Sequence, residues 1–394
     1  MSPRPSIDPV SSRSKARGFR RRLSPVLLVF SAILVAYWAA AALVVGADPY
    51  DLYRWGLRAD AGAAHQPRFA GYLLRMAARD PKADLVLIGG STSTTYSADD
   101  LRDAFPGARD PWNISYHASR ALDRHLATTT IVKQSTAPRV LIVLDWLYAR
   151  SVDQKRDNFP VYLYDDDPFN DLRMVDQRGL AATARLLRTG SSMPDPAIAD
   201  ADEVAFNDRG YRSFQTQKTM ARIERLLGRH RADVDRVGAT DCGAFPAFNV
   251  QFLPALRALS AQGKRVDIIV PPYSLAMYYE WVAGPKYLSL GGSTFLSDQL
   301  LLRRCMVEVA ATLPGVFVSA IDTDPANVSD LGAFRDTSHL YDPVLLKKVL
   351  SAVDDPAYRL TPENVDAYAV RLRAAAKAYQ LRNSKLGLGN ETGS

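Results

Sequence analysis

The sequence contains few of the residues that proteins use for redox and metal chemistry. Only two cysteines and five histidines occur among its 394 residues. Cys242 and Cys305 form no Cys-x-x-Cys motif, and no histidines share the spacing of a zinc site. We therefore expect no metal and no cofactor. The sequence leaves open whether the two cysteines form one disulfide or remain separate buried thiols.

Positive charge is scarce outside one short segment. Residues 1–22 hold seven basic residues and one acidic residue, and so account for +6 of the net charge of +7. The nearly neutral remainder has no basic stripe along which phosphates could bind. The charge distribution therefore excludes a nucleic-acid-binding protein.

Nucleotide-binding motifs are lacking as well. Neither a Gly-x-Gly-x-x-Gly pattern nor a P-loop lysine follows the first predicted strand of the body, at 85–89. The turn after this strand is rich in glycine and serine and could still bind a phosphate group. A phosphate- or nucleotide-binding module therefore remains an alternative.

A long apolar run does occur near the N-terminus. Residues 23–47 contain no charged side chain, and about 20 apolar residues suffice to cross a bilayer core. A signal peptide has an apolar region of only roughly 7–15 residues, which favours an uncleaved anchor over a signal cleaved at Ala47. Because cationic flanks stay in the cytoplasm, we expect a single-pass protein of the inner (plasma) membrane, with residues 48–394 in the periplasm or outside the cell.

Beyond residue 80, short apolar segments alternate with helical patterns. The segments at 85–89, 140–144, 266–270 and 316–321 predict buried strands. This alternation indicates an α/β fold with a parallel sheet covered on both faces.

The polar stretch 150–250, with helical patterns near 178–188 and 215–229, is too long for a simple crossover and predicts an insertion.

The patterns divide the chain into five parts. These are a cytoplasmic basic tail (1–22), a transmembrane helix (23–47), a juxtamembrane linker and helix (48–80), a body (81–355) with the insertion 150–250, and a C-terminal helix and tail (356–394).

A serine follows the first strand of the body in a turn made by two glycines. Ser91 comes after Gly89 and Gly90, and we expect it to enter the next helix. Loops at the carboxyl ends of parallel strands form the functional edge of such sheets. Backbone N–H groups there could stabilise the oxyanion that forms when a serine attacks an ester carbonyl. Ser91 is thus a candidate nucleophile, and Gly90 a candidate part of the oxyanion site.

An acid and a histidine lie together after the last predicted strand. Asp336 stands three residues before His339. At this spacing the carboxylate can accept the imidazole Nδ1–H, which leaves Nε2 free to take a proton from a serine. A helix-capping role for Asp336 is the simpler alternative, but it does not account for the histidine. The combination predicts a Ser91–His339–Asp336 triad.

The segments IGGSTS at 88–93 and DTSH at 336–339 resemble the nucleophile and Asp-x-x-His blocks of the SGNH (GDSL-like) hydrolase superfamily. The resemblance covers roughly residues 84–345 without the insertion. It points to the membrane-anchored branch of polysaccharide O-acetyltransferase proteins, such as alginate-acetylation components and DltD-like proteins. It implies a three-layer α/β/α sandwich with a flavodoxin-like sheet, an acylated envelope glycan or similar ester as substrate, and a membrane acyltransferase as a partner.

Two blocks of the superfamily are incomplete in this chain. The family's oxyanion hole combines the nucleophile's N–H, a glycine N–H and an asparagine side chain. Asn113 begins a segment like the second block, but Ala118 stands in place of the glycine. The asparagine of the third block is missing, so either Asn113 substitutes for it or the hole is weaker. Asp145, Trp146 and Tyr273 follow predicted strands and are candidate substrate contacts.

The sequence thus predicts a membrane-anchored, extracytoplasmic serine esterase or O-acyltransferase. One alternative is a catalytically inactive SGNH-like protein that binds a glycan or a partner. The other is the phosphate- or nucleotide-binding module. The Asp-x-x-His pair favours the enzyme, because a phosphate site has no use for it.

Overall fold

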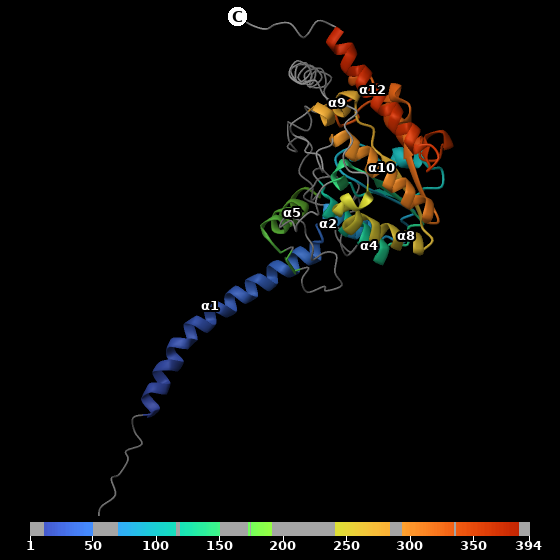
Figure 1. Cartoon of the computed structure of the whole chain (residues 1–394). Coiled ribbons are helices and arrows are strands. Elements are labelled where there is room, and N and C mark those ends of the chain that lie inside the picture. Colours follow the sequence, from blue (N-terminus) through green and yellow to red (C-terminus); the bar gives the residue numbers. More distant parts are fainter. Residues whose placement is uncertain are drawn as a thin grey trace, which may run out of the picture. The chain divides into compact units, whose positions relative to one another are not determined.

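In a computed structural model of the chain, the structure describes residues 12–49, 70–115, 119–149, 172–173, 175–190, 241–283, 294–334 and 336–385 (Figure 1). The chain forms two compact units. The first consists of Met1–Gly62 with Asp166–Met193, and the second of Ala63–Asp165 with Pro194–Ser394. The helix predicted at 215–229 lies outside the described residues.

The first unit contains two helices that contact each other, α1 (Ser12–Ala47) and α5 (Gln177–Thr189). Helix α5 matches the helix predicted at 178–188. Small or apolar side chains three or four residues apart are buried on each helix: Ala41, Val44 and Ala47 on α1, and Ala182 and Leu186 on α5. This spacing places each set on one face of its helix.

Helix α1 contains the predicted membrane span. Its segment Pro25–Ala47, 23 residues, is long and apolar enough to cross a membrane. Its large apolar side chains from Val26 to Trp38, and Leu43 near its end, are mostly exposed. A core helix of a soluble protein would bury such side chains. The exposure therefore fits a helix whose surroundings are not protein.

Six strands form one sheet in the second unit, in the order β2-β1-β3-β4-β5-β6. The first five pair in parallel and the last is antiparallel: β1 (Leu85–Ile88), β2 (Pro111–Asn113), β3 (Arg139–Val143), β4 (Arg265–Val270), β5 (Val316–Ala320) and β6 (Arg359–Leu360). The central strands are nearly continuous runs of buried Val, Ile and Leu, as parallel strands usually are. The prediction of an α/β fold with a mainly parallel sheet is confirmed. Strand β6 was not predicted, because two residues carry no readable pattern.

Helices accompany the strands along the chain: α2 (Ala70–Arg79), α3 (Ala98–Ala104), α4 (Ala121–Gln134), α8 (Leu253–Ala261), α9 (Leu275–Ala283), α10 (Phe295–Thr312), α11 (Pro343–Ser351) and α12 (Val365–Lys385). Short turns complete the elements: 3₁₀ turns at Trp146–Ala149, Cys242–Ala244, Ile321–Thr323, Pro325–Val328, Leu331–Ala333 and Pro356–Tyr358, and a π-helical turn at Phe248–Phe252. Helix α4 contacts both α2 and α8, whereas α9, α10 and α12 contact one another (Figure 1).

A buried polar cluster fixes α12 to the sheet. Arg303 of α10 donates to Asp322, just after β5, at 3.0 Å, and Tyr368 of α12 donates to the other oxygen of the same carboxylate at 3.0 Å. Tyr278 of α9 donates to this carboxylate as well. Strand β6 pairs with β5, and β6 and α12 both lie in the second unit.

A disulfide joins Cys242 and Cys305, which answers the question the sequence left open. The two residues are 63 positions apart, and β4 lies between them. Because the bond restricts the unfolded chain, replacing both cysteines with alanine should lower the free energy of unfolding by about 2–4 kcal/mol. Urea denaturation of the full chain in detergent micelles measures this change. Equal stabilities of the two proteins would contradict the prediction.

Candidate active site

The predicted nucleophile lies where the order of the parallel strands reverses. Strands β2 and β3 flank β1 on opposite sides, so the connection from β1 to β2 and the connection from β2 to β3 run in opposite directions across the sheet. Ligands of open parallel sheets bind beside the carboxyl end of a strand at such a switch point. Ser91 follows β1 at this place, and Asp145 follows the neighbouring strand β3.

The structure brings the three predicted triad residues together. The Oγ of Ser91 lies 2.8 Å from Nε2 of His339, and Nδ1 of the same ring lies 2.6 Å from Oδ2 of Asp336. This network assigns the ring proton to Nδ1, which donates to the carboxylate. The side chains of His339 and Asp336 are 21% and 35% exposed, so solvent or a substrate can reach them. The arrangement can accept the Ser91 hydroxyl proton on a correctly oriented imidazole.

Asp336 is held as an anion. Burial alone would raise the pKa of its carboxyl, but hydrogen bonds from the His339 ring and from Ser338 lower it well below its ordinary value. Its Oδ1 accepts the backbone N–H of His339 at 2.8 Å, together with the N–H and hydroxyl of Ser338 at 2.8 and 2.9 Å. The same contacts fix the carboxylate beside the imidazole.

This lowered pKa predicts a pH-dependent contribution to stability. A carboxyl whose pKa is lower in the folded chain stabilises the fold above its unfolded pKa of about 4, and the contribution is lost as the pH falls toward the folded value. The difference in unfolding free energy between wild type and Asp336→Asn should therefore shrink as the pH falls below about 4. Urea denaturation at a series of pH values measures it. A difference that stays constant down to about pH 2 would contradict the prediction.

Ser91 lies in a turn, not at the start of a helix as predicted. Helix α3 begins at Ala98 and is capped by the side chain of Ser97. The turn before it is held by other contacts, because Asn113 Nδ2 donates to the carbonyl oxygens of Ser93 and Tyr96, both at 2.8 Å. These bonds fix the segment between Ser91 and α3 to the residue that ends β2.

The two glycines before Ser91 are required by close packing. A Cβ at Gly89 would lie 2.0 Å from the Oγ of Ser93, and a Cβ at Gly90 would lie 2.3 Å from an Nη2 atom of Arg124. Neither glycine has a positive φ. The glycines therefore give space to buried polar side chains and are not needed for a special backbone conformation.

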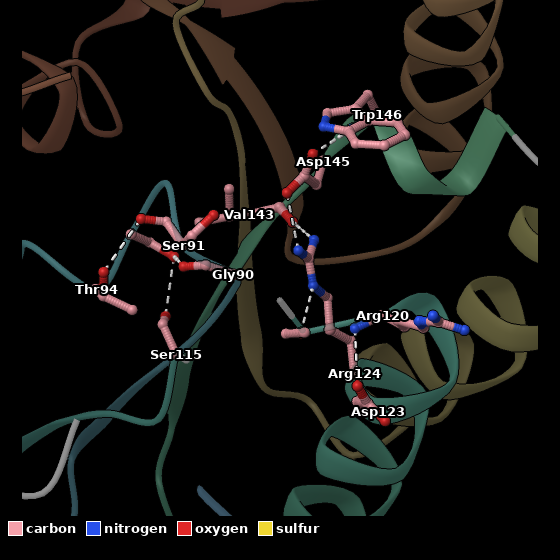
Figure 2. Close-up of polar contacts among 12 residues, drawn as sticks. Gly90, Ser91, Thr94, Ser115, Arg120, Asp123, Arg124, Val143, Asp145 and Trp146 are labelled. Carbon is pink, nitrogen blue, oxygen red and sulfur yellow. Dashed lines mark hydrogen bonds and ion pairs between the residues drawn. The ribbon is translucent and has the colours of Figure 1, made fainter. Parts of the chain in front are cut away.

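That arginine belongs to a buried polar cluster beside the nucleophile turn (Figure 2). Arg124 of α4 donates to the Val143 carbonyl at 3.1 Å and to Oδ2 of Asp145 at 2.9 Å, and its Nε donates to Ser119 at 3.0 Å. Tyr273 donates to Oδ1 of Asp145 at 2.8 Å. We call Arg124, Asp145 and Tyr273 the arginine cluster.

The arginine cluster changes the interpretation of the predicted substrate contacts. Asp145 and Tyr273 are buried and bind each other, so neither offers a free group to a substrate. Trp146 is partly buried, its backbone N–H donates to Asp145, and its ring packs edge-on against Phe295. All three lie at strand ends, as predicted, and Asp145 and Tyr273 are bonded to each other.

The predicted oxyanion donors differ in their availability. Both amide hydrogens of Asn113 are used by the turn, so this side chain is not the substitute donor. Ala118 lies outside the described residues. The backbone N–H of Ser91 donates to none of the described residues, and the buried hydroxyl of Thr92 has no partner among them either. Thr92 was not predicted, since nothing in the sequence distinguishes it from the neighbouring serines and threonines.

A second unpredicted residue, Ser274, holds the loop that carries the acid and the base. Its backbone N–H and its hydroxyl both donate to the carbonyl of Thr337, at 3.1 and 2.8 Å. Ser274 directly follows Tyr273 of the arginine cluster. The segment that follows β4 therefore has two partners. Tyr273 donates to Asp145 of the arginine cluster, and Ser274 donates to the loop that carries Asp336 and His339.

Comparison with known proteins gives no independent identification. No family model matches the chain, and no curated protein matches it significantly. Among the described residues, no group of three or more His, Cys, Asp or Glu side chains could hold a metal ion. The functional interpretation therefore rests on the geometry of the site.

Proposed function

We propose that the chain is a serine esterase or O-acyltransferase of the SGNH type, with Ser91 as nucleophile, His339 as base and Asp336 as its orienting acid. The observation that carries this proposal is the continuous hydrogen-bonded series from the Ser91 hydroxyl through both ring nitrogens to an ionised carboxylate. Its members come from loops 248 residues apart in sequence. A helix cap or a phosphate site requires no such series.

The proposed reaction has two half-reactions. Ser91 Oγ attacks the carbonyl carbon of an ester while His339 Nε2 takes its proton, and the bond to the leaving alcohol then breaks as the imidazolium returns the proton to that oxygen. Water or a sugar hydroxyl next attacks the acyl-serine, losing its proton to the same ring. As this second intermediate collapses, the bond to Ser91 Oγ breaks, the imidazolium returns the proton to that oxygen, and an acid or a new ester is released. The N–H of Ser91, which donates to none of the described residues, is the proposed oxyanion donor.

The strand order 2-1-3-4-5 of the parallel part supports a flavodoxin-like sheet within a three-layer α/β/α sandwich, the architecture that the SGNH resemblance implies. The apolar helix supports a single-pass anchor in the inner (plasma) membrane. Two observations support an extracytoplasmic body: the cationic tail before the span, and the disulfide in the second unit, since disulfides persist mainly in oxidising compartments.

An acylated envelope glycan is the proposed substrate, because an anchored body reaches the polymers next to the membrane. Whether water or a sugar hydroxyl accepts the acyl group separates esterase from transferase. A membrane acyltransferase that supplies the acyl group is the proposed partner. These statements rest on the family resemblance and on the anchor, not on a shaped substrate pocket.

Labelling with a serine-reactive fluorophosphonate tests the nucleophile. We expect the full chain in detergent to be labelled at Ser91, and the Ser91→Ala variant to remain unlabelled. Ser93→Ala removes a hydroxyl from the same turn and is the matched control, which should still be labelled. Absence of labelling in wild type, or equal labelling of wild type and Ser91→Ala, would refute the proposal.

A catalytically inactive SGNH-like binding protein is the second candidate. The observation that favours it is the full engagement of Asn113, which leaves no asparagine donor among the described residues at the site. Loss of one oxyanion donor typically costs about 10²–10³ in rate. A binding protein would bind acetylated glycan without releasing acetate, whereas the enzyme should release acetate in a manner that requires Ser91.

A further inference from the structure

The insertion contributes a helix with two distinct faces. On one face of α5, Ala182, Thr183 and Leu186 are buried, in the unit that α5 forms with the end of α1. The opposite face carries an exposed apolar stripe made of Leu180, Ala181, Ala184 and Leu187. Leu180 and Leu187 are 37% and 54% exposed.

The position of α5 along α1 is informative. Among the described side chains of α1, the buried ones are Ala41, Val44 and Ala47, in the last turns of the segment long enough to cross a membrane. Leu43, within the same turns, remains 49% exposed. Lipid around the proposed anchor would therefore extend along α1 as far as the last turns, where α5 contacts α1.

The length and charge of α5 indicate how it would meet a bilayer. Thirteen residues make a helix of about 20 Å, shorter than the roughly 30 Å apolar core, so α5 cannot span the membrane. Arg188 lies at the C-terminal end of the apolar stripe and is exposed. An amphipathic helix with arginine beside an apolar stripe is typical of helices that lie in the headgroup region, where arginine binds lipid phosphates.

We propose that α5 is an interfacial helix, whose stripe of Leu180, Ala181, Ala184 and Leu187 is buried in the outer leaflet of an anionic phospholipid bilayer beside the end of α1. The inference rests on the proposed anchor and is independent of the proposed chemistry. It gives the insertion a function, because part of it then holds the chain at the membrane surface. The occupant of the stripe is lipid and not a second copy of the chain.

Depth-dependent fluorescence quenching tests this proposal. Both natural cysteines are bonded to each other, so Leu187→Cys and Leu180→Cys each introduce a single free thiol for an environment-sensitive dye. Each full chain is reconstituted into vesicles of phosphatidylcholine and phosphatidylglycerol with nitroxide-labelled lipid. Ile33→Cys, on the exposed surface of α1, reports on the anchor. Val250→Cys, 58% exposed in the second unit, is the control outside the helix.

We expect a nitroxide near the headgroups to quench the dyes on α5 at least about two-fold more than the dye at position 250, and a nitroxide at the chain ends to quench them less. Quenching at position 33 without quenching on α5 would refute the interfacial helix and leave the anchor standing. This is also the result expected if a second copy covers the stripe. Absence of quenching at position 33 would refute the anchor and the interfacial helix together, while fluorophosphonate labelling of Ser91 would be unaffected.

Discussion

Asp336→Asn should lower kcat for hydrolysis of an aryl acetate by about 10⁴-fold, with little change in KM. In the wild-type chain the carboxylate accepts the Nδ1–H of His339. An asparagine can present its NH₂ group to Nδ1, which moves the ring proton to Nε2. The ring then cannot take a proton from Ser91, and no negative charge stabilises the imidazolium. Initial rates over a range of ester concentrations separate kcat from KM.

The substitution should leave the fold of the loop largely intact. Oδ1 of Asp336 accepts three hydrogen bonds from Ser338 and His339, and the amide oxygen of asparagine can accept the same bonds. The expected fall in kcat is therefore due to the missing negative charge and to the changed tautomer of the His339 ring. A far-ultraviolet circular dichroism spectrum equal to that of wild type would establish that the loss is not due to unfolding.

Asp342→Asn is the matched control, because it makes the same chemical change six residues further on. Asp342 caps α11, with its side chain accepting from the N–H of Leu345 at 2.8 Å. Asparagine caps helices about as well as aspartate, so the rate should stay within about two-fold of wild type. A near-wild-type rate for Asp336→Asn, or an equal loss in both variants, would contradict the assigned role.

The three residues that the structure brings together could be proposed as a triad from the sequence, because they follow two strands that were themselves readable. Buried parallel strands appear as short apolar runs, and their carboxyl ends share one edge of the sheet. Ser91 and the Asp336–His339 pair were predicted for this reason. The likeness to the SGNH blocks is confined to short segments, and no family model or curated protein matches the chain.

The environment of the triad could not be predicted, because it depends on side chains that meet only through packing. Arg124 stands in an ordinary helical pattern in the sequence, where an exposed arginine is the usual expectation. It is buried only because α4 brings it against the end of β3 and against Gly90. The bond between Asp145 and Arg124 could not be predicted for the same reason, since the two residues are 21 positions apart. The pairing of the cysteines likewise depends on tertiary structure.

Arg124→Met should lower the free energy of unfolding by about 3–5 kcal/mol. Its guanidinium and the Asp145 carboxylate are 2% and 6% exposed and lie 2.9 Å apart. Removing the cation leaves the carboxylate buried, with Tyr273 and the backbone N–H of Trp146 as its remaining donors. These two neutral donors compensate a buried negative charge less well than an arginine does. Urea denaturation of the full chain in detergent measures the loss.

Two further variants test whether the loss of stability comes from the unpaired Asp145 carboxylate or from removal of any arginine. Arg102 forms an exposed ion pair with Asp99, with side chains 45% and 86% exposed, so Arg102→Met should cost no more than about 1 kcal/mol. Adding Asp145→Asn to Arg124→Met removes the stranded charge, so the double variant should be more stable than Arg124→Met alone. Equal losses in Arg124→Met and Arg102→Met, or a further loss in the double variant, would contradict the interpretation.

Because the guanidinium packs against Gly90, next to Ser91, fluorophosphonate labelling of Arg124→Met should be slower than that of Arg102→Met even where both chains are folded.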